Sequence, residues 1–590
     1  MTSSAPVLPG KTKRFQLRDV LPVWGWARTY KRGNLVGDVM AGLIVTVMLV
    51  PQSMAYALLA GLPPQVGLYA SILPLVLYGL LGTSRALAVG PVAIVSLLVV
   101  SGVSPLAEPG SVQYGQLVLT LAFLVALIQV GMGLVRLGFL VNFMSHPVLS
   151  GFTSAAALVI GFSQLKHLLG LSIPNLDFFP LVWYALSHLS ETNLITFALG
   201  GSGILVLLYF RYGLGTHLQR FGLRANLALP LSKSAPLVIV LLGTILVWAL
   251  HLDEVAGVKI VGSVPAGLPQ ITFPQLDLSV WQALLPTALV ISFVGYMESI
   301  AVAKSLASKR RQKVVANQEL IALGIANLGA TFSGGYPVTG GFSRSVVNFD
   351  AGANTGLASM ITAGLIALTV IFLTPLFYFL PQAVLAAIVI VAVAGLIDLG
   401  TFRHIWRYNR ADAISYGVTF LAVLLFDVEI GILIGVVTAI LFFVYRTSTP
   451  HVAVVGRVGE SEIYRNVLRH EVQCWPQVVA VRIDESLYFA NTKFLEETVL
   501  GLIVEQPEVE HFVLIGSAIN FIDASALETL EALQRQLKDA GVAFHLAAIK
   551  GPVMDRLELI GFVDHIGRGR IHMSTHEAMK AIGVLDEDGY

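Results

Sequence analysis

Two segments rich in glycine, serine and threonine interrupt long apolar stretches of this sequence. They are residues 81–96 (LGTSRALAVGPVAIVS) and residues 328–345 (LGATFSGGYPVTGGFSRS). Irregular backbone at membrane depth persists only where protein buries it or where it lines a cavity, because lipid cannot satisfy its N–H and C=O groups. A matched pair of such breaks, one in each half of a chain, is typical of the central site of membrane transporters.

The chemistry that these breaks predict is anion binding. We expect half-helices to begin near Gly90 and Gly340, with their N-termini pointing at each other. Each N-terminus offers unpaired backbone N–H groups and the positive end of a helix dipole, about half an elementary charge. Glycines allow close approach, Pro91 suits a first helical turn, and Ser343 adds a hydroxyl donor. The alternative is that these small residues only allow tight helix packing.

Glu298 is an acid in the middle of a predicted membrane span, within the sequence FVGYMESI (293–300). An ionised side chain at that depth costs at least about 2.5–3.5 kcal/mol, so we expect it to be paired, protonated or functional. Our hypothesis is that Glu298 binds the coupling cation, most simply a proton. The alternative is a structural ion pair, for example with Arg344.

The composition predicts a polytopic membrane protein that positions these residues. Of 590 residues, 55% are hydrophobic and only 12% are charged, against about 25% charged in soluble domains. The net charge of +1 and the lack of long basic runs give no indication of a nucleic-acid partner. The single cysteine, Cys474, excludes internal disulfides and a cysteine-based metal site. The N-terminal residues have no signal-peptide pattern.

Apolar stretches long enough to cross a bilayer predict about fourteen spans. The first half holds spans near residues 35–57, 64–82, 90–101, 114–137, 147–168, 193–210 and 235–251; the second holds spans near 280–304, 317–332, 340–349, 357–378, 381–398, 411–427 and 429–446. Lysine and arginine concentrate in the loops after even-numbered spans, which places both termini in the cytoplasm. An odd number of spans in each half predicts an inverted repeat.

After Tyr445 the sequence changes to that of a soluble α/β domain. Strand-like runs at residues 478–483, 511–515 and 543–547 alternate with helical patterns at 491–506, 524–540 and 552–559. Strands separated by helices predict a small, mainly parallel sheet.

Several ordered motifs resemble those of one family. They are PQSMAYA (51–57), GLY (67–69), GTSR (82–85), GPVA (90–93) and GGFSR (340–344). The chain resembles the SulP sulfate permease (solute carrier 26-like) anion transporters, and its tail resembles their STAS domain.

The resemblance implies a 7+7 inverted repeat with core and gate domains, a homodimer in the lipid bilayer, and elevator-like movement of an anion. It implies a cytoplasmic segment at residues 1–30, a transport domain at 31–447 and a cytoplasmic STAS domain at 448–590, in the plasma (inner) membrane. The substrate site then comprises Gln52, Tyr56, Gly90, Pro91, Val92, Ala93, Gly340, Gly341, Phe342, Ser343 and Arg344. Gln52 and Tyr56 lie four residues apart and share a helix face; the alternative is that Gln52 hydrogen-bonds a neighbouring helix and Tyr56 packs.

The resemblance leaves the substrate and the coupling ion open. In sodium-coupled bicarbonate members, the acid matching Glu298 holds sodium together with nearby hydroxyls. Here Val302 and Phe342 stand where such hydroxyls are wanted, which favours protons over sodium. We expect sulfate as the substrate, with bicarbonate or a dicarboxylate (by symport or exchange) as alternatives. An uncoupled anion channel is the rival class.

The tail carries a candidate regulatory site. The sequence NFIDASAL (520–527) resembles the turn that bears a phosphorylatable serine in bacterial anti-sigma-factor antagonists, and Ser525 matches that serine. Asp523 is alternatively a helix N-cap. We expect this domain to serve in regulation through a cytoplasmic partner, in folding or in dimer contacts, rather than in catalysis. We expect no enzyme, cofactor or metal site, because the sequence has neither a His/Cys ligand cluster in its membrane part nor a nucleotide-binding P-loop in its tail.

Overall fold

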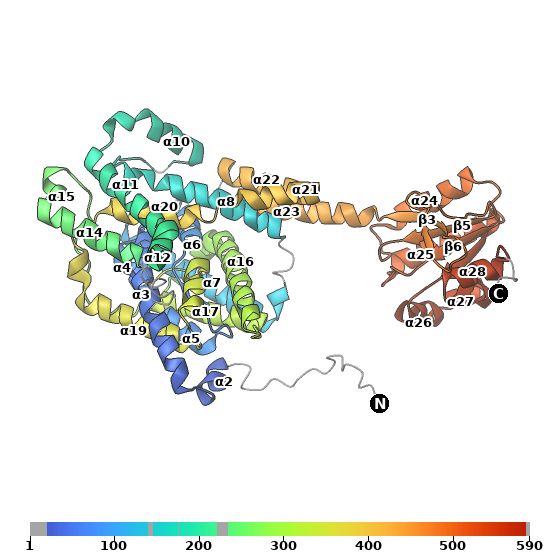
Figure 1. Cartoon of the computed structure of the whole chain (residues 1–590), viewed down its shortest axis with the longest axis horizontal. Helices are drawn as coiled ribbons and strands as arrows, with labels where there is room; N and C mark the ends of the chain where they lie inside the picture. Colours follow the sequence, from blue (N-terminus) through green and yellow to red (C-terminus); the bar gives the residue numbers. More distant parts are fainter. Residues whose placement is uncertain (1–20, 140–144, 175, 221–233, 427, 586–590) are drawn as a thin grey trace. The chain divides into compact units, whose positions relative to one another are not determined.

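The computed structural model describes residues 21–139, 145–174, 176–220, 234–426 and 428–585. Residues 1–20 of the expected N-terminal segment, and the loop residues 221–233, therefore lie outside the described residues. Contacts divide the chain into two compact units, residues 1–439 and 440–590, with the division inside helix α23 (Val428–Ser448). Figure 1 shows a helical first unit and an α/β second unit.

The first unit is built almost entirely of helices. Its first half holds α2 (Pro22–Arg28), α3 (Arg32–Leu59), α4 (Pro64–Tyr69), α5 (Leu73–Leu81), strand β1 (Val89–Gly90), α6 (Ala93–Val103), α7 (Val112–Leu134), α8 (His146–Ser163), α9 (Leu165–Leu168), α10 (Phe178–Ser187), α11 (Leu194–Tyr209), the π-helical turn η3 (Phe210–Leu214), α12 (Gly215–Arg220), α14 (Ala235–Leu250) and α15 (Leu252–Val255). Its second half holds α16 (Leu278–Lys309), α17 (Ala316–Phe332), strand β2 (Thr339–Gly340), α18 (Phe342–Asp350), α19 (Leu357–Phe372), α20 (Gln382–Ala394), α21 (Leu399–Tyr408), α22 (Arg410–Leu425) and α23.

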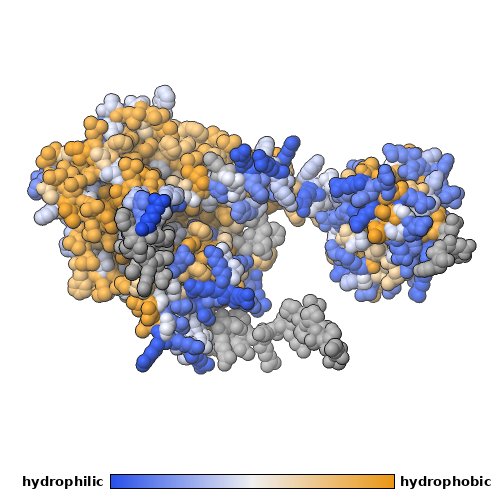
Figure 2. All heavy atoms as spheres, viewed as in Figure 1, coloured by the Kyte–Doolittle hydropathy of each residue, from blue (hydrophilic) through white to orange (hydrophobic). Residues whose placement is uncertain are grey.

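Every apolar stretch predicted to span a membrane contains a helix. Seven helical segments of the described chain are long and apolar enough to cross a bilayer, and hydrophobic side chains cover most of the visible surface of this unit (Figure 2). Helices α6 and α18 have only 11 and 9 residues, as expected for half-helices. The sequence did not predict α10 and α21, because both are short and α21 mixes arginines with aromatic residues.

The two halves of the first unit repeat one order of elements. A long helix (α3 or α16) is followed by shorter helical structure (α4 and α5, or α17), a two-residue strand, a half-helix and another long helix (α7 or α19). Strands β1 and β2 pair antiparallel. This order agrees with the inverted repeat predicted from hydropathy.

Packing separates the helices into two groups. Helix α17 packs on α5 and α7, α16 packs on α6 and α7, and α3 packs on α18 and α19. In the second group, α8 packs on α22 and α11 packs on α20. Helix α20 also reaches α3, so it lies where the two groups meet.

The second unit is a six-stranded sheet with helices on both faces. Its strands are β3 (Val452–Arg457), β4 (Tyr464–Asn466), β5 (Val478–Ile483), β6 (His511–Ile515), β7 (Ala543–Ala547) and β8 (Ile571–His572), in the order β4-β3-β5-β6-β7-β8. Its helices are α24 (Thr492–Glu505), α25 (Ala524–Asp539), α26 (Gly551–Leu559), α27 (Phe562–Ile566) and α28 (Thr575–Ile582). Strands β5 to β8 run parallel, and β3 is antiparallel to both neighbours.

The sequence prediction for this unit is confirmed for three strands, three helices and a mainly parallel sheet. It missed β3, β4 and β8, of which β4 and β8 have only three and two residues. It also missed α27 and α28, which follow the last predicted helix.

Candidate functional site

The two glycine-rich breaks meet directly in the structure. Val89 is paired with Gly340, and Gly90 with Thr339. Each short strand then leads into a half-helix. Because Gly90 has a φ of 150°, a conformation that other residues rarely adopt, glycine is required where the first strand turns toward its helix.

The half-helices begin two to three residues later than the sequence predicted. Val92 is the N-cap of α6 and Gly341 is the N-cap of α18, and neither end is capped by a side chain. The prediction that Pro91 occupies the first turn of a helix is therefore wrong, because Pro91 precedes the N-cap. The first N–H groups of both helices lack intrahelical partners.

Side chains from α16 and α17 hold strand β2 in place. The Ser299 hydroxyl accepts a hydrogen bond from Gly340 N (2.8 Å) and shares one with the Thr339 hydroxyl (2.7 Å). The Asn327 carboxamide accepts from Val338 N (2.7 Å) and donates to Val338 O (3.1 Å). This backbone is thus fixed on two long helices.

Half-helix α18 is also tied to the first break. The Ser345 hydroxyl accepts a hydrogen bond from Ala88 N (2.9 Å), and Asn348 Nδ2 donates to Ala86 O (3.0 Å). These bonds join segments more than 250 residues apart in the chain.

Arg344 lies between the two breaks and is 2% exposed. Its Nη1 donates a hydrogen bond to Pro91 O. A Cβ at Gly341 would stand 2.9 Å from Arg344 Nη2, and one at Gly90 would stand 3.5 Å from it. The Nε and Nη2 atoms are buried without a hydrogen-bond partner in the described structure. A buried guanidinium with unused donors is a site for an anion, because such donors are costly to leave unpaired.

A cavity of about 340 Å³ opens beside this arrangement. Of the predicted site residues, nine line it: Gln52, Tyr56, Val92, Ala93, Gly341, Phe342, Ser343, Arg344 and Glu298. The other three predicted residues do not line the cavity: Gly90 and Gly340 belong to the paired strands β1 and β2, and Pro91 follows β1.

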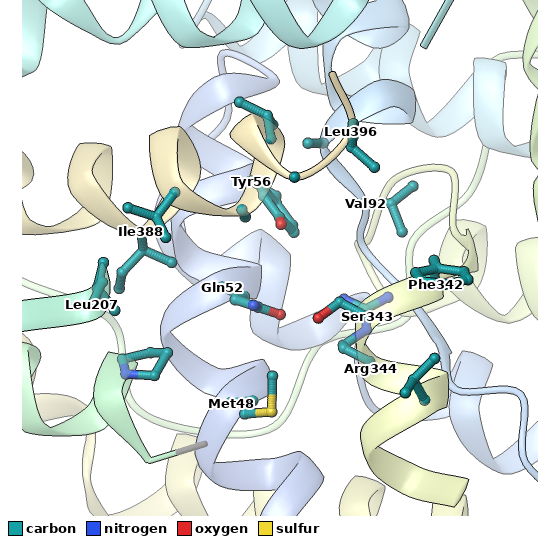
Figure 3. Close-up of a pocket in the computed structure, with 18 of the residues that line it drawn as sticks. Met48, Gln52, Tyr56, Val92, Leu207, Phe342, Ser343, Arg344, Ile388 and Leu396 are labelled. Atoms are coloured by element: carbon teal, nitrogen blue, oxygen red, sulfur yellow. The ribbon is translucent and has the colours of Figure 1, made fainter. Parts of the chain in front are cut away.

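The polar groups of α3 and α18 point toward each other on one wall of the cavity. Figure 3 shows Gln52 and Ser343 pointing toward one another, with the Tyr56 hydroxyl on the same side of α3. Both α3 side chains are 7% exposed, and the described residues give neither polar tip a hydrogen-bond partner. Phe342, by contrast, is 55% exposed, and its ring points away from Gln52 (Figure 3).

The opposite wall consists of residues that the sequence analysis did not identify. It is formed by Leu207 of α11, Arg211 of η3, Ala235 and Pro236 of α14, and six residues in and after α20: Ile388, Val391, Ala392, Val393, Gly395 and Leu396. Arg211 Nη1 donates to Val391 O (3.1 Å), which joins η3 to α20. These residues form no motif, so only the fold reveals them.

Glu298 of α16 completes the cavity wall. Its Oε2 atom is buried without a hydrogen-bond partner in the described structure. The ion pairs of the described residues do not include one between Glu298 and Arg344 within 4.0 Å. The structural ion pair considered as an alternative is therefore absent from this conformation of the described chain.

Two other expectations concern the second unit and metals. Ser525 is an exposed residue in the first turn of α25. Asp523 caps that helix, since its Oδ1 accepts from Ala526 N (2.8 Å), which confirms the capping prediction. The described residues contain no cluster of His, Cys, Asp and Glu side chains that could hold a metal ion.

Comparison with known families decides the relationship. A model described as the sulfate permease family matches residues 35–419, and a STAS domain model matches residues 469–578. The chain belongs to the sulfate permease family. It is therefore a multi-pass membrane protein of an anion transporter family, with a C-terminal STAS domain.

Curated relatives in this family align over nearly the whole chain. The chain is 38% identical to sulfate transporter 4.1, chloroplastic, of Arabidopsis thaliana, over 97% of its own length and 84% of the relative's. It is 35% identical to a probable sulfate transporter of Mycobacterium tuberculosis, over 94% of its own length and 98% of the relative's.

Solved structures show the same fold. The murine solute carrier 26 family member A9 anion transporter, in the inward-facing state, matches with a TM-score of 0.87 and 25% identity, over 98% of this chain and 96% of that chain. The transmembrane domain of a cyanobacterial bicarbonate transporter matches with a TM-score of 0.58 and 22% identity, over 70% of this chain and 98% of that chain. The latter match supports the fold alone.

Proposed function

We propose that this protein is a proton-coupled sulfate transporter, with the anion held between the N-termini of α6 and α18. The observation that carries the proposal is the buried Arg344 guanidinium, whose Nε and Nη2 donors have no partner in the described structure and which lines the cavity with Glu298. Relatives named as sulfate transporters, at 35–38% identity, support sulfate as the anion.

Charge balance supports a divalent anion with a proton. Arg344 supplies one positive charge, and each half-helix end supplies about half a charge. Their sum of about two charges offsets sulfate when Glu298 is protonated. With Glu298 ionised, the same sum offsets only one further negative charge. Sulfate and an ionised Glu298 therefore disfavour each other, which couples the anion to a proton.

The same arithmetic distinguishes the alternative substrates. A monovalent anion such as bicarbonate or chloride balances the site while Glu298 stays ionised, so it requires no proton. A dicarboxylate has the charge of sulfate but is longer, and the cavity volume alone does not discriminate between them. Charge balance thus links a divalent anion to a proton and a monovalent anion to an ionised Glu298, and sulfate itself is proposed from the named relatives.

The position of the cavity supports movement of one helix group against the other. Helices α3, α6, α16 and α18 carry the anion-binding residues, whereas α11, α14 and α20 supply the opposite wall. We propose that the first group moves as a body past the second, in an elevator-like exchange of access.

We further propose that the protein acts as a homodimer in the plasma (inner) membrane, with both termini in the cytoplasm. The STAS domain then binds a regulatory partner at the exposed Ser525.

Uptake of radiolabelled sulfate into proteoliposomes tests the substrate and the site. We expect the full-length protein to take up sulfate, and unlabelled sulfate to compete more strongly than bicarbonate, fumarate or chloride. The uptake rate should fall at least about 100-fold in Arg344→Gln, because a buried charged hydrogen-bond partner is removed. The control Arg403→Gln, at an exposed position of α21, should transport normally. Preference for fumarate or bicarbonate would keep the site and overturn the substrate. Normal uptake by Arg344→Gln would overturn the site.

A further inference from the structure

A basic hollow of about 350 Å³ lies at the β3–β4 edge of the second unit. Three arginines line it, Arg465, Arg469 and Arg482, together with two histidines, His451 and His470. This cluster takes no part in the proposed transport chemistry, and the inference drawn from it does not depend on that proposal.

The single acid of the hollow is already engaged. Asp484 accepts hydrogen bonds from Arg482 Nε (2.6 Å) and Nη2 (3.1 Å), and its other contact is His451 Nδ1 (2.8 Å). Arg465 and Arg469 have no side-chain hydrogen bond or ion pair within the described residues, and both are exposed. Three guanidinium groups against one carboxylate leave two positive charges unneutralised.

A hydrogen-bonded turn presents the free donors on one side. Asn466 O accepts from the backbone N of Arg469 (3.0 Å) and of His470 (3.1 Å), and Asn466 Oδ1 accepts from Leu468 N (2.8 Å). The turn brings Arg469 and His470 back beside Arg465 at the end of β4. The arginines are therefore held in a concave arrangement that suits the several oxygens of a phosphate group.

One residue of this hollow lies close in the chain to the end of an apolar helix. His451 follows the last residue of the apolar helix α23, Ser448, by three residues, a distance of at most about 11 Å along an extended chain. Exposed Tyr445 and Arg446 near the end of α23 are the residue types that lie among lipid headgroups. A headgroup region several ångströms deep on each side of the hydrocarbon is thus within reach of the hollow.

We propose that this basic hollow binds the phosphate headgroup of an anionic lipid. Arg465 and Arg469 supply the donors that contact the phosphate oxygens, while Asp484 keeps Arg482 and His451 in place. Basic groups next to a membrane helix are attracted to anionic headgroups, and the concave turn adds directed hydrogen bonds to that attraction. The site would link the STAS domain to the lipid composition around the transporter.

Titration of the full-length protein in detergent with short-chain phosphatidic acid tests this site. We expect saturable binding, weakened about tenfold or more in the double variant Arg465→Gln/Arg469→Gln and unchanged in the control Arg535→Gln/Arg568→Gln, which removes two arginines elsewhere on the same unit. Both pairs are exposed, so folding should be retained, and size-exclusion profiles would verify it.

Two further probes identify the source of the phosphate. Short-chain phosphatidylcholine should bind at least about tenfold more weakly than phosphatidic acid, because its headgroup carries a compensating positive charge. Inorganic phosphate should fail to displace phosphatidic acid at equal concentration. Equal binding of both lipids, equal displacement by inorganic phosphate, or unchanged binding in the double variant would each overturn the proposal.

Discussion

Asp38 and Glu319 differ from Glu298 in what surrounds their carboxylates, although all three lie in apolar helices of the first unit. Asp38 and Glu319 are 0% exposed. Glu319 accepts hydrogen bonds from Tyr78 Oη (2.7 Å), the N (2.7 Å) and Oγ1 (2.5 Å) of Thr83, and Ser84 N (3.0 Å).

Asp38 is satisfied in the same way, mostly by the other half of the chain. It accepts from Tyr30 Oη (3.0 Å), Asn354 N (2.6 Å), and the N (3.0 Å) and Oγ1 (2.6 Å) of Thr355. Each carboxylate therefore fastens a loop next to one half-helix: Glu319 holds the loop before β1, and Asp38 holds the loop after α18.

Glu298 has no comparable set of donors. One of its oxygens is buried and unpartnered in the described structure, and it borders the cavity that holds the Arg344 guanidinium. A buried acid that is fully hydrogen-bonded stabilises the fold, whereas one left unpaired beside a cavity is available to a proton or ligand. The hydrogen-bond partners of a buried acid therefore distinguish a structural role from a functional one, whereas its position in an apolar helix does not.

The largest effect that this comparison predicts is on stability. Glu319→Ala should lower the free energy of unfolding by about 3–5 kcal/mol, because it leaves several buried donors unpaired. Glu298→Ala should change it by less than about 1 kcal/mol. Thermal unfolding of the two purified variants measures the difference, with Tyr78→Phe, which removes one of the four bonds to Glu319, as an intermediate case. Equal losses of unfolding free energy in Glu319→Ala and Glu298→Ala would contradict the distinction between a structural and a functional acid.

A second prediction concerns the position of the Arg344 guanidinium, whose Nε and Nη2 donors have no partner in the described structure. In Gly341→Ala the new Cβ meets Arg344 Nη2 at 2.9 Å, so the guanidinium must shift. We expect the concentration of sulfate for half-maximal uptake to rise roughly tenfold, about 1.4 kcal/mol, with little change in thermal stability. Gly364→Ala is the matched control, because nothing lies within 4 Å of its added Cβ. An unaltered sulfate dependence in Gly341→Ala would show that Arg344 does not depend on this space.

The smallest predicted effect extends the comparison to the second unit, where His545 is buried and bonded only to other histidines. Its Nε2 lies 3.1 Å from His511 Nδ1, and its Nδ1 lies 3.2 Å from His572 Nε2. Burial, together with His511, His572 and Arg570, lowers the pKa of His545 from 6.5 to about 4. Glu510 and Glu577 act in the opposite direction on His511 and His572.

The sign of the resulting pH dependence follows from this depressed pKa. Between pH 6.5 and 4 the unfolded chain binds a proton that the folded domain excludes, so stability is full above pH 6.5 and is lost as the pH falls through that window. We expect a loss on the order of 1 kcal/mol from pH 7 to 5. Hydrogen exchange of β6 and β7 in the full-length protein measures it. His545→Gln should reduce the loss, and an undiminished loss would assign it to other groups.

The sequence was sufficient for most of the long helices and for the two half-helices, because these elements rest on local signals. Runs of apolar residues indicate helices, and glycine-rich breaks in corresponding places indicate half-helices. The exact start of each half-helix was not predictable, since it depends on the pairing of Gly90 with Thr339. The Pro91 carbonyl accepts a hydrogen bond from Arg344, and the residue type alone does not reveal this role.

The candidate site was predictable only in part. Motifs led to Gln52, Ser343 and Arg344 on one wall, but the opposite wall has no motif. The roles of Asp38 and Glu319 were also invisible, because their donors lie more than 200 residues away in the chain for Glu319 and more than 300 for most of those of Asp38. Glu298 was identified because it lies in an apolar segment. Asp38 and Glu319 also lie in apolar segments, so this criterion alone does not distinguish the three acids.

Proton entry driven by sulfate tests the central claim most directly. Proteoliposomes containing the full-length protein and a pH-sensitive dye receive external sulfate, and the dye reports the internal pH. We predict acidification with the wild-type protein. Glu298→Gln should still exchange labelled for unlabelled sulfate, which shows that the anion site is intact, but without acidification. Sulfate-driven acidification that persists in Glu298→Gln would contradict the assignment of Glu298 as the proton-coupling residue.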